Sequence, residues 1–468
     1  MTGNLLEGKY KRVHFVGIGG TGMAPLARVF VDLGCRVTGS DLNESAAVRW
    51  LREAGASIQL GHRAENVGDA ELVVISSAVP ATNPEVVRAR ELGLPVRKRA
   101  EVLGALTRER KSIAVGGTHG KTTTSAMVSL ILAQAGLSPT YLVGGDVADL
   151  GGSGRLGTGE WLVAEADEFD GSFLRFSPRV AVITSVEPDH LDFYGSMEAI
   201  VDAFTRFAAL PPREGCLVGC LDDERVAKIL LNAPGRTVAY GLSTAAEWRA
   251  SALRLDELGS RFVVHRGNEE LGEFSLRVPG RHNIANALAA LAASHEAGAS
   301  LVAAREALAI FGGARRRFET KGIVRGITVV DDYGHHPTEI AATLAAARTK
   351  SPRRLWCIFQ PHTYHRTKSL LPEFARALEA ADIVIVTDIY MPAGREVDTL
   401  GISSADVVAA MNHAAAHHIG SLEEAVAYAC ERLEPGDLLI TMGAGNVFRA
   451  GEEIVACLAQ GRSIGEDQ

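Results

Sequence analysis

The chain has 468 residues, of which 47% are hydrophobic and 22% charged, and its formal net charge is −8 at pH 7. This length is too great for one hydrophobic core and predicts two to four domains, and the composition argues against disorder. The negative charge and the lack of a long basic block argue against nucleic acid as the main partner, because short runs such as Arg97-Lys98-Arg99 and Arg315-Arg316-Arg317 are more typical of solvated faces.

The cysteines and the N-terminal segment indicate the compartment. Six cysteines, of which only Cys216 and Cys220 are close together, form neither a disulfide framework nor a zinc-binding pattern. Residues 1–15 contain no apolar signal core, and no apolar run is long enough to span a membrane. We therefore expect a cytoplasmic protein without a membrane span.

The first region, from Arg12 to about Leu103, alternates short β-branched runs with stretches of helical periodicity, which predicts βαβ units around a parallel sheet. Its first turn reads GIGGTG, Gly17 to Gly22, between a strand and a helix, and Asp41 ends the second strand. In this context the glycines predict that a diphosphate approaches the helix N-terminus, with Asp41 accepting hydrogen bonds from a nucleoside. The alternative is a tight turn that binds nothing.

The second region opens with VGGTHGKTTT, Val115 to Thr124, again between a strand and a helix. This segment departs by one position from the usual phosphate-binding loop, because Val115 stands where the first glycine is required. A phosphate loop needs consecutive backbone N–H groups around one concavity, a Lys for the outer phosphates and a hydroxyl for magnesium. The residues that supply these parts are Gly116, Gly117, Gly120, Lys121 and Thr122. We therefore predict that this loop binds a nucleotide.

Two later strands of this region end in acidic and imidazole side chains, at the edge where α/β sheets bind ligands. These residues are Glu165, Asp167, Glu168 and Asp170 after one strand, and Glu187, Asp189, His190 and Asp192 after the next. Magnesium prefers oxygen ligands, so Glu165 is a natural ligand and His190 a less usual one. The alternatives are solvated loop charges and, for His190, a hydrogen-bonded histidine at a strand end.

After this region the sequence pattern changes to alternating β segments with turn signals at Gly259-Ser260 and Gly267-Asn268. This pattern predicts a small antiparallel insertion in the nucleotide-binding domain. From near Gly312 strands and helices alternate again, as in a further doubly wound α/β domain. Its polar strand ends, DDYGHHP and FQPHTYHRTK, predict a functional rim.

Eight segments resemble, in chain order, the alanine-adding group of the Mur ligase family, which builds peptidoglycan precursors. They are HFVGIGGTGM, GGTHGKTTT, EADEFDGSF, EPDHLDFYG, GRHNIANALAA, RRFE, DDYGHHPTE and FQPHTYHRT. The resemblance spans nearly the whole chain and implies an α/β protein of three domains. These would be a Rossmann-like N-terminal domain for the UDP-sugar (1–108), a central P-loop ATPase domain with the antiparallel insertion (109–312), and a Rossmann-like C-terminal domain for the amino acid (313–468).

The resemblance also implies ATP and Mg²⁺ as cofactors, with UDP-N-acetylmuramate and L-alanine as substrates, in a monomer or a dimer. It assigns catalytic roles to Lys121, His190, His335 and Arg366, and magnesium to Thr122, Glu165 and His190. The implied nucleotide contacts are Gly116, Gly117, Thr118, His119, Gly120, Lys121, Thr122, His282, Asn283, Asn286, Arg317 and Asp332. The implied UDP-sugar contacts are Gly19, Gly20, Thr21, Gly22, Ser40, Asp41 and Ser77.

Two departures from related sequences bear on these assignments. Some relatives carry Arg directly after the His of FQPH, where this chain has Thr363, so a second Arg for the amino-acid carboxylate is missing there. Enzymes that add later amino acids carry a carbamate-forming Lys in the helix after the DH segment. The corresponding segment here, SMEAIVDAFTRFAAL, contains no Lys, as in the alanine-adding group.

Three other functions are weighed against this one. A nicotinamide-dependent oxidoreductase would explain Gly17 to Gly22 and Asp41 but leaves Lys121 without a role, and a mechanical or regulatory ATPase leaves the first glycine loop unexplained. A sibling ligase that attaches a preformed tripeptide to the same UDP-sugar during cell-wall recycling shares most of the motifs. The segments GIGGTGM and DDYGHHP favour the alanine-adding group over this sibling.

Overall fold

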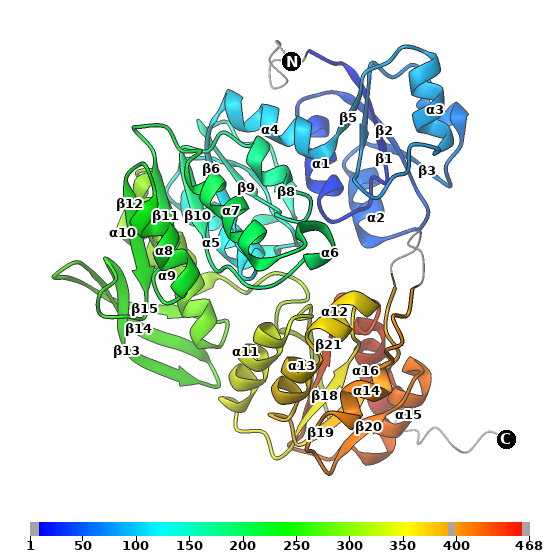
Figure 1. The fold of residues 1–468 in the computed structure, drawn as a ribbon, viewed down its shortest axis with the longest axis vertical. Helices are drawn as coiled ribbons and strands as arrows, with labels where there is room; N and C mark the ends of the chain where they lie inside the picture. The colour runs from blue at the N-terminus through cyan, green and yellow to red at the C-terminus, as the bar shows by residue number, and fades with distance from the viewer. Residues whose placement is uncertain (1–8, 392–397, 461–468) are drawn as a thin grey trace. The chain divides into compact units, whose positions relative to one another are not determined.

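The computed structural model describes residues 9–391 and 398–460, apart from the side chain of Asp192. The chain forms two compact units (Figure 1). The first unit comprises Met1–Ala252, Phe262–Ser275 and Ala285–Gly312, and the second comprises Leu253–Arg261, Leu276–Ile284 and Gly313–Gln468. The first unit therefore holds the first predicted region and most of the second, whereas Leu253–Arg261 and Leu276–Ile284 of the second region belong to the second unit.

The N-terminal sheet is parallel, with the strand order β3-β2-β1-β4-β5. Its strands are β1 (Arg12–Val16), β2 (Arg36–Asp41), β3 (Ser57–Leu60), β4 (Leu72–Ile75) and β5 (Val96–Lys98). The accompanying helices are α1 (Met23–Asp32), α2 (Ala46–Glu53), η1 (Ala64–Val67), α3 (Pro84–Glu91) and α4 (Arg99–Glu109). The strand order reverses beside β1, which is where the loop Gly17 to Gly22 leaves the sheet.

The central sheet has ten strands in the order β15-β14-β13-β12-β11-β10-β6-β9-β7-β8. Its strands are β6 (Lys111–Gly116), β7 (Thr140–Leu142), β8 (Gly154–Arg155), β9 (Trp161–Glu165), β10 (Val180–Ile183), β11 (Cys216–Cys220), β12 (Thr237–Gly241), β13 (Trp248–Asp256), β14 (Gly259–Arg266) and β15 (Glu269–Leu276). Strand β6 pairs in parallel with β9 on one side and β10 on the other. The loop after β6 is therefore flanked by the ends of the two strands that carry the acidic residues.

Helices connect these strands. They are α5 (Lys121–Gln134), η2 (Ala148–Leu150), η3 (Ser172–Arg175), α6 (Leu191–Tyr194), α7 (Met197–Ala208), α8 (Glu224–Asn232), α9 (Arg281–Glu296) and α10 (Leu301–Ile310). Helix α5 is buried along nearly all its length, since eleven of its residues, from Thr122 to Leu132, are buried.

The predicted insertion corresponds to β13, β14 and β15, whose two-residue connections require antiparallel neighbours. The turn prediction at Gly267-Asn268 is confirmed, but the one at Gly259-Ser260 is wrong, because the turn is Glu257-Leu258 and Gly259 begins β14. Gly259 has a φ of +132°, and a Cβ there would overlap the carbonyl oxygen of Leu276. This glycine therefore permits a close approach of two strands.

The C-terminal sheet has the order β16-β17-β21-β18-β19-β20, with β16 antiparallel at its edge and the other pairs parallel. Its strands are β16 (Glu319–Val324), β17 (Ile327–Asp332), β18 (Leu355–Phe359), β19 (Ile383–Val386), β20 (Ala416–His418) and β21 (Leu438–Met442). The helices are α11 (Pro337–Arg348), α12 (Tyr364–Ser369), α13 (Leu371–Leu378), α14 (Ser404–Ala409), α15 (Leu422–Arg432) and α16 (Phe448–Gln460).

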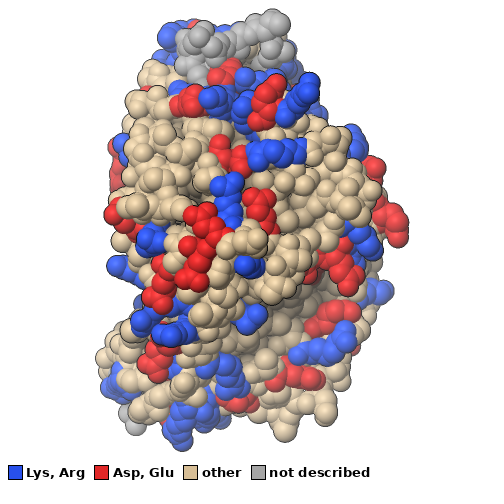
Figure 2. Space-filling model, turned by 90° about the vertical axis from the view of Figure 1, so that its left-hand side faces the viewer, with Lys and Arg blue, Asp and Glu red and all other residues tan. Residues whose placement is uncertain are grey.

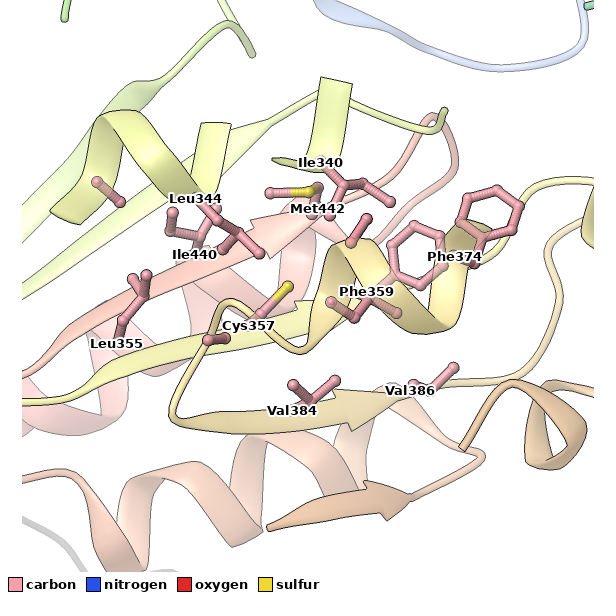
Figure 3. Packing of buried hydrophobic residues seen from close by; sticks show 14 of the residues in the cluster. Ile340, Leu344, Leu355, Cys357, Phe359, Phe374, Val384, Val386, Ile440 and Met442 are labelled. Carbon is pink, nitrogen blue, oxygen red and sulfur yellow. The ribbon is translucent and has the colours of Figure 1, made fainter. Parts of the chain in front are cut away.

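Alternate residues of these strands face a buried core on each side of the sheet. On one side, Phe359 of β18 packs on Phe374 of α13 with ring centroids 5.4 Å apart, and Ile340 of α11 joins the same cluster (Figure 3). On the other side, Trp356 and Ile358 of β18 belong to a second cluster. This two-sided burial explains why the β18 segment LWCIF is apolar throughout.

Charge distribution and helix hydropathy bear on what the protein can contact. On the face drawn in Figure 2, basic and acidic side chains are interspersed. Within the described residues, none of the helices combines the length and hydropathy that a bilayer crossing requires.

Candidate functional site

The loop between β6 and α5 is shaped by two glycines with positive φ, Gly117 at +131° and Gly120 at +77°. A Cβ on Gly117 would overlap the hydroxyl of Thr184, and one on Gly120 would overlap the side-chain oxygen of Asn286. The backbone N–H of Thr118 donates to the carbonyl of Ser185 over 2.9 Å, and the backbone N–H of His119 donates to the hydroxyl of the same serine over 3.1 Å. The loop is therefore fastened to the segment after β10.

Lys121 begins α5 and turns its ammonium back into this loop. Its Nζ donates to the carbonyl of Gly117 over 2.6 Å and to both carboxylate oxygens of Glu168 over 2.8 and 2.9 Å. Burial opposes the charged form of the lysine, but the carboxylates of Glu168 and neighbouring acids outweigh it and raise the pKa of Lys121. The lysine therefore stays an ammonium at the mouth of the loop.

Thr122 and Glu165, two of the predicted magnesium ligands, lie together. The hydroxyl of Thr122 donates to Oε2 of Glu165 over 2.9 Å, and the backbone N–H of Gly144 donates to the same oxygen over 2.9 Å. The oxygens of Thr122 and Glu165 form a donor set of the kind that magnesium prefers. The residues present therefore fit the ion, although their role as ligands stays a prediction.

His190, the third predicted ligand, caps α6 with a φ of +53°. Its Nε2 lies 3.6 Å from Oδ2 of Asp189, and its ring meets the ring of Phe169 edge-on with centroids 4.9 Å apart. The neighbouring acid Asp192 falls outside the described side chains. The backbone N–H of His190 donates to Oδ1 of Asp189 over 2.8 Å, and the role of His190 as a magnesium ligand stays a prediction.

The other acidic residues at these strand ends have separate partners. Asp170 accepts a hydrogen bond of 2.8 Å from the hydroxyl of Ser77, one of the predicted UDP-sugar contacts. Glu187 lies 3.4 Å from Nε2 of His119 and donates its backbone N–H to the hydroxyl of Thr118 over 2.9 Å. These contacts tie the phosphate loop and Ser77 to the acidic segments.

The predicted adenine segment, GRHNIANA, contains three candidate residues. The side-chain oxygen of Asn286 accepts a hydrogen bond of 3.3 Å from Thr124, which places Asn286 against the phosphate loop. His282 is partly buried, and this burial together with the nearby charge of Arg317 lowers its pKa to about 4. Asn283 donates to the carbonyl of Pro279 over 2.7 Å. His282 is therefore neutral at physiological pH, and its contact with adenine stays a prediction.

In the second unit, Arg317 and Asp332 lie near one another. The guanidinium of Arg317 donates to Glu339 over 3.3 Å and lies over the ring of Tyr333. Asp332 accepts hydrogen bonds from the backbone N–H groups of Phe318 and Gly334, over 2.8 and 2.7 Å. Burial raises the pKa of Asp332 to about 6, and Arg317 limits the rise.

The two polar strand ends of this unit lie close together. Nδ1 of His335 lies 3.0 Å from the carbonyl of Tyr333, and because a carbonyl only accepts, Nδ1 carries the proton in this contact. His335 and His362 meet edge-on with ring centroids 6.0 Å apart, and Arg366 lies 3.2 Å from Nδ1 of His362. The structure therefore links His335 to Arg366 through His362, a residue that the sequence analysis did not assign a role.

The first glycine loop is held by Asp41, whose Oδ2 accepts the backbone N–H of Gly19 over 2.9 Å. Gly20 and Thr21 are exposed, whereas Ser40 is fully buried. The hydroxyl of Ser40 donates to Oε2 of Glu85 over 2.6 Å and therefore supports the sheet from inside. A direct contact between Ser40 and a substrate stays a prediction.

Glu85 is a buried carboxylate that the sequence analysis missed, because in NPEVVRARE it is typical of a solvated helix charge. It is fully buried, and its described donors also include Nε2 of His14 over 3.1 Å and the amide of Asn66 over 2.6 Å. Burial alone raises its pKa, but the hydrogen bonds from His14, Ser40 and Asn66 outweigh burial and lower the pKa to about 2. Glu85 thus joins β1, β2 and η1 beneath the loop.

Comparison with known proteins gives full-length matches. The family model described as "Mur ligase family, catalytic domain" matches residues 12–111, "Mur ligase middle domain" matches 115–294, and "Mur ligase, glutamate ligase domain" matches 316–445. A UDP-N-acetylmuramate--L-alanine ligase of Geotalea daltonii is 46% identical, covering 97% of this chain and 100% of the relative. A protein of the same name from Geobacter sulfurreducens is 45% identical, covering 98% and 100%.

Solved structures agree with these matches. The crystal structure of a UDP-N-acetylmuramate-alanine ligase from Thermotoga maritima has a TM-score of 0.82 and 31% identity, covering 96% of this chain and 100% of that one. A murein peptide ligase from Psychrobacter arcticus has a TM-score of 0.74 and 28% identity, covering 96% and 99%. The predicted α/β fold of three domains is thereby confirmed.

The Glu85 network predicts a pH-dependent contribution to stability. Because the pKa in the folded chain lies below the ordinary 4.5, this stabilisation is present above pH 4.5 and is lost as the pH falls toward about 2. We expect Glu85→Gln to lower the free energy of unfolding at pH 7 by on the order of 1–3 kcal/mol, because the buried donors lose a charged acceptor. Urea denaturation at pH 7 and at pH 3.5 (~1 unit below the ordinary value) measures the difference, which should shrink at the lower pH.

The matched control is Glu91→Gln on the same helix, because the carboxylate of Glu91 is exposed and contacts only the surface residue Arg88 among the described residues. This control should leave the stability nearly unchanged. Equal stability of Glu85→Gln and the unsubstituted protein at pH 7 would show that the network is not stabilising.

Proposed function

Since the chain belongs to the Mur ligase family, we propose that it joins L-alanine to the lactyl carboxylate of UDP-N-acetylmuramate in peptidoglycan synthesis. ATP would be consumed and ADP and phosphate released. The observation that carries the proposal is the full-length identity of about 45% to ligases named for these two substrates. All six cysteines lie in the described part of the chain and none is in a disulfide, which supports a reducing, cytoplasmic location.

The parts of the phosphate loop suit the activation of a carboxylate. A carboxylate is a poor electrophile, and transfer of the γ-phosphoryl group of ATP to it gives an acyl phosphate with a good leaving group. Lys121, already an ammonium, and backbone N–H groups at the N-terminus of α5 would hold the phosphates and stabilise the charge that moves between them. The loop is fastened to its surroundings before the ligand arrives, so little reorganisation is required.

Magnesium belongs to the proposal because the site offers its preferred oxygen ligands. Thr122 and Glu165 would hold the ion, with His190 as the third predicted ligand. When bound, the ion neutralises phosphate charge. The contacts of His282, Asn283, Asn286, Arg317 and Asp332 with the nucleotide are part of the same proposal.

The polar rim of the second unit suits the amino acid. Arg366 would bind the alanine carboxylate, and the proton on Nδ1 of His335 leaves Nε2 as the acceptor for a proton of the incoming ammonium. The free amine then attacks the acyl carbon, phosphate leaves, and the amide remains. Exclusion of water from the site would protect the acyl phosphate from hydrolysis during this step.

A sibling activity, ligation of a preformed tripeptide to the same UDP-sugar, is the second candidate because a murein peptide ligase shares this fold. The alanine reaction is favoured because relatives at 45–46% identity are named for it, whereas the murein peptide ligase is 28% identical. Family membership gives no support to a nicotinamide-dependent oxidoreductase or to a regulatory ATPase.

The test of the proposal is phosphate release from ATP in the presence of UDP-N-acetylmuramate and one amine substrate at a time. We expect release that depends on both the UDP-sugar and L-alanine, with glycine and serine weaker, because one methyl group discriminates by only about 1–3 kcal/mol. Faster release with the tripeptide L-alanyl-γ-D-glutamyl-diaminopimelate would establish the sibling activity instead.

Lys121 provides a test of the ATP site. We expect Lys121→Ala to reduce phosphate release at least about a hundredfold, as removal of a preorganised charge-stabilising group does. The substitution also leaves Glu168 buried without its cation, so the variant should be less stable. The double variant Lys121→Ala/Glu168→Gln should recover the melting temperature without recovering activity, and near-normal turnover of either variant would contradict the assignment.

Arg366 provides a test of the amino-acid site. A guanidinium can hold a carboxylate through two parallel hydrogen bonds, which Lys does not reproduce. We expect Arg366→Lys to raise the alanine KM by about tenfold or more while the KM values for ATP and the UDP-sugar barely move. Arg376→Lys, at an exposed arginine of α13 that pairs with Glu373, is the control. A common shift of all three KM values would indicate a structural role for Arg366.

A further inference from the structure

Tyr194, the last residue of α6, joins the two acidic segments of the central sheet. Its hydroxyl donates to the backbone carbonyl of Glu168 over 2.5 Å, although the two residues are 26 apart in the sequence. Glu168 follows β9 and α6 follows β10, and both of these strands pair with β6, which leads into the phosphate loop. The hydroxyl of Tyr194 therefore connects the segments that flank this loop on its two sides.

The carbonyl of Glu168 closes a tight turn. It accepts the backbone N–H of Gly171 over 2.9 Å, which is the hydrogen bond of a β-turn at residues 168–171. It thus receives one bond from within the turn and a second from α6. Burial and the nearby carboxylates of Glu168 and Asp170 raise the pKa of Tyr194, so the phenol keeps its proton and remains a donor.

The side chain of Glu168 is the partner of the phosphate-loop lysine. Its two carboxylate oxygens accept hydrogen bonds from Nζ of Lys121 over 2.8 and 2.9 Å, and Glu168 is only 3% exposed. The direction of the lysine therefore depends on where the backbone of Glu168 is held. Tyr194 bonds this backbone directly.

Aromatic contacts hold α6 against the same turn without the hydroxyl of Tyr194. A Cβ on Gly171 would lie 3.9 Å from Cε1 of Phe193, and the ring of Phe193 meets that of Tyr194 edge-on with centroids 4.9 Å apart. The rings of Phe169 and His190 also meet edge-on. A phenylalanine at position 194 would keep these contacts, so its only loss would be the bond to the carbonyl of Glu168.

We propose that Tyr194 is a positioning residue of the nucleotide site, which holds the backbone of Glu168 so that the carboxylate keeps Lys121 directed into the phosphate loop. A cation stabilises a moving phosphoryl group best when its direction is fixed before the reaction, because no reorganisation is then required. This inference rests on the proposed ATP-dependent function and adds a residue that acts only through others.

Steady-state kinetics of phosphate release by the full-length protein measure this role. We expect Tyr194→Phe to lower kcat between about twofold and tenfold, as the loss of one neutral hydrogen bond predicts. The KM values for L-alanine and UDP-N-acetylmuramate should stay the same, because the substitution leaves their proposed sites intact. An unchanged kcat, or a rise in both of these KM values, would overturn the proposal.

The matched control is Tyr141→Phe in β7. The hydroxyl of Tyr141 also donates to a backbone carbonyl, that of Leu150, over 2.5 Å and within the same unit. Both variants should have similarly lowered melting temperatures, because each loses one bond of the same kind, but only Tyr194→Phe should have a lower kcat. An equal loss of kcat in both variants would show that the effect follows from stability alone, which contradicts the proposal.

A double-mutant cycle tests whether the effect passes through Lys121. In the background Lys121→Ala/Glu168→Gln no ammonium remains to be positioned, so Tyr194→Phe should have little further effect on the residual kcat. The same fold loss in this background and in the otherwise unsubstituted protein would contradict the proposal. A raised magnesium requirement with an unchanged kcat at saturating magnesium would also contradict it, because that result would assign Tyr194 to His190 at the start of α6.

The same assays separate this inference from the proposed function. Failure of the unsubstituted protein to release phosphate with ATP, UDP-N-acetylmuramate and L-alanine would contradict the function itself, together with the inference that rests on it. An active unsubstituted protein whose kcat is unaffected by Tyr194→Phe would contradict only the role of Tyr194.

Discussion

The phosphate loop is organised around one ion pair, between the ammonium of Lys121 and the carboxylate of Glu168. The side chains of Lys121 and Glu168 are only 14% and 4% exposed, so either one alone would be an uncompensated charge in a poorly solvated place. Their bond joins the first turn of α5 to the segment after β9, and the adjacent bond between Thr122 and Glu165 joins the same two elements. An arriving phosphate therefore meets a lysine that is already charged and already directed into the loop, in competition with the carboxylate of Glu168 and the carbonyls of Gly117 and Thr118.

The two glycine loops of the first unit use glycine for a reason that a motif alone does not reveal. In the phosphate loop, Gly120 makes room for the side chain of Asn286, and in the first loop Gly22 makes room for Arg99. In both cases a polar side chain from a distant part of the sequence occupies the space of the missing Cβ. Each of these glycines thus lets a polar side chain from a distant part of the sequence lie against the backbone of its loop. A residue with a Cβ at the same position would hold that side chain further from the loop.

The sequence was sufficient to predict what depends on local pattern. The strand–loop–helix order, the phosphate loop and the acidic strand ends follow from periodicity and short motifs, and the three-domain α/β fold was predicted correctly. The partners of the buried acids were not predictable, because Glu85 and His14 are 71 residues apart and Lys121 and Glu168 are 47 apart. The turn predicted at Gly259 is wrong for a similar reason. Gly259 is needed because the carbonyl of Leu276, which is distant in sequence, leaves no room for a Cβ there.

Backbone strain in the second unit bears on the missing second arginine. Thr363 stands where some relatives carry Arg, and its φ of +66° is costly for a β-branched residue. Its N–H donates to the carbonyl of Tyr390 over 3.0 Å, and its own carbonyl accepts the hydroxyl of Thr367 over 2.8 Å, so both sides of the strained residue are fixed. With Thr363 in this conformation, α12 begins at Tyr364, and Arg366 in this helix lies next to His362. The position therefore orients the side chain of Arg366, and the proposed carboxylate site depends on this fixed backbone.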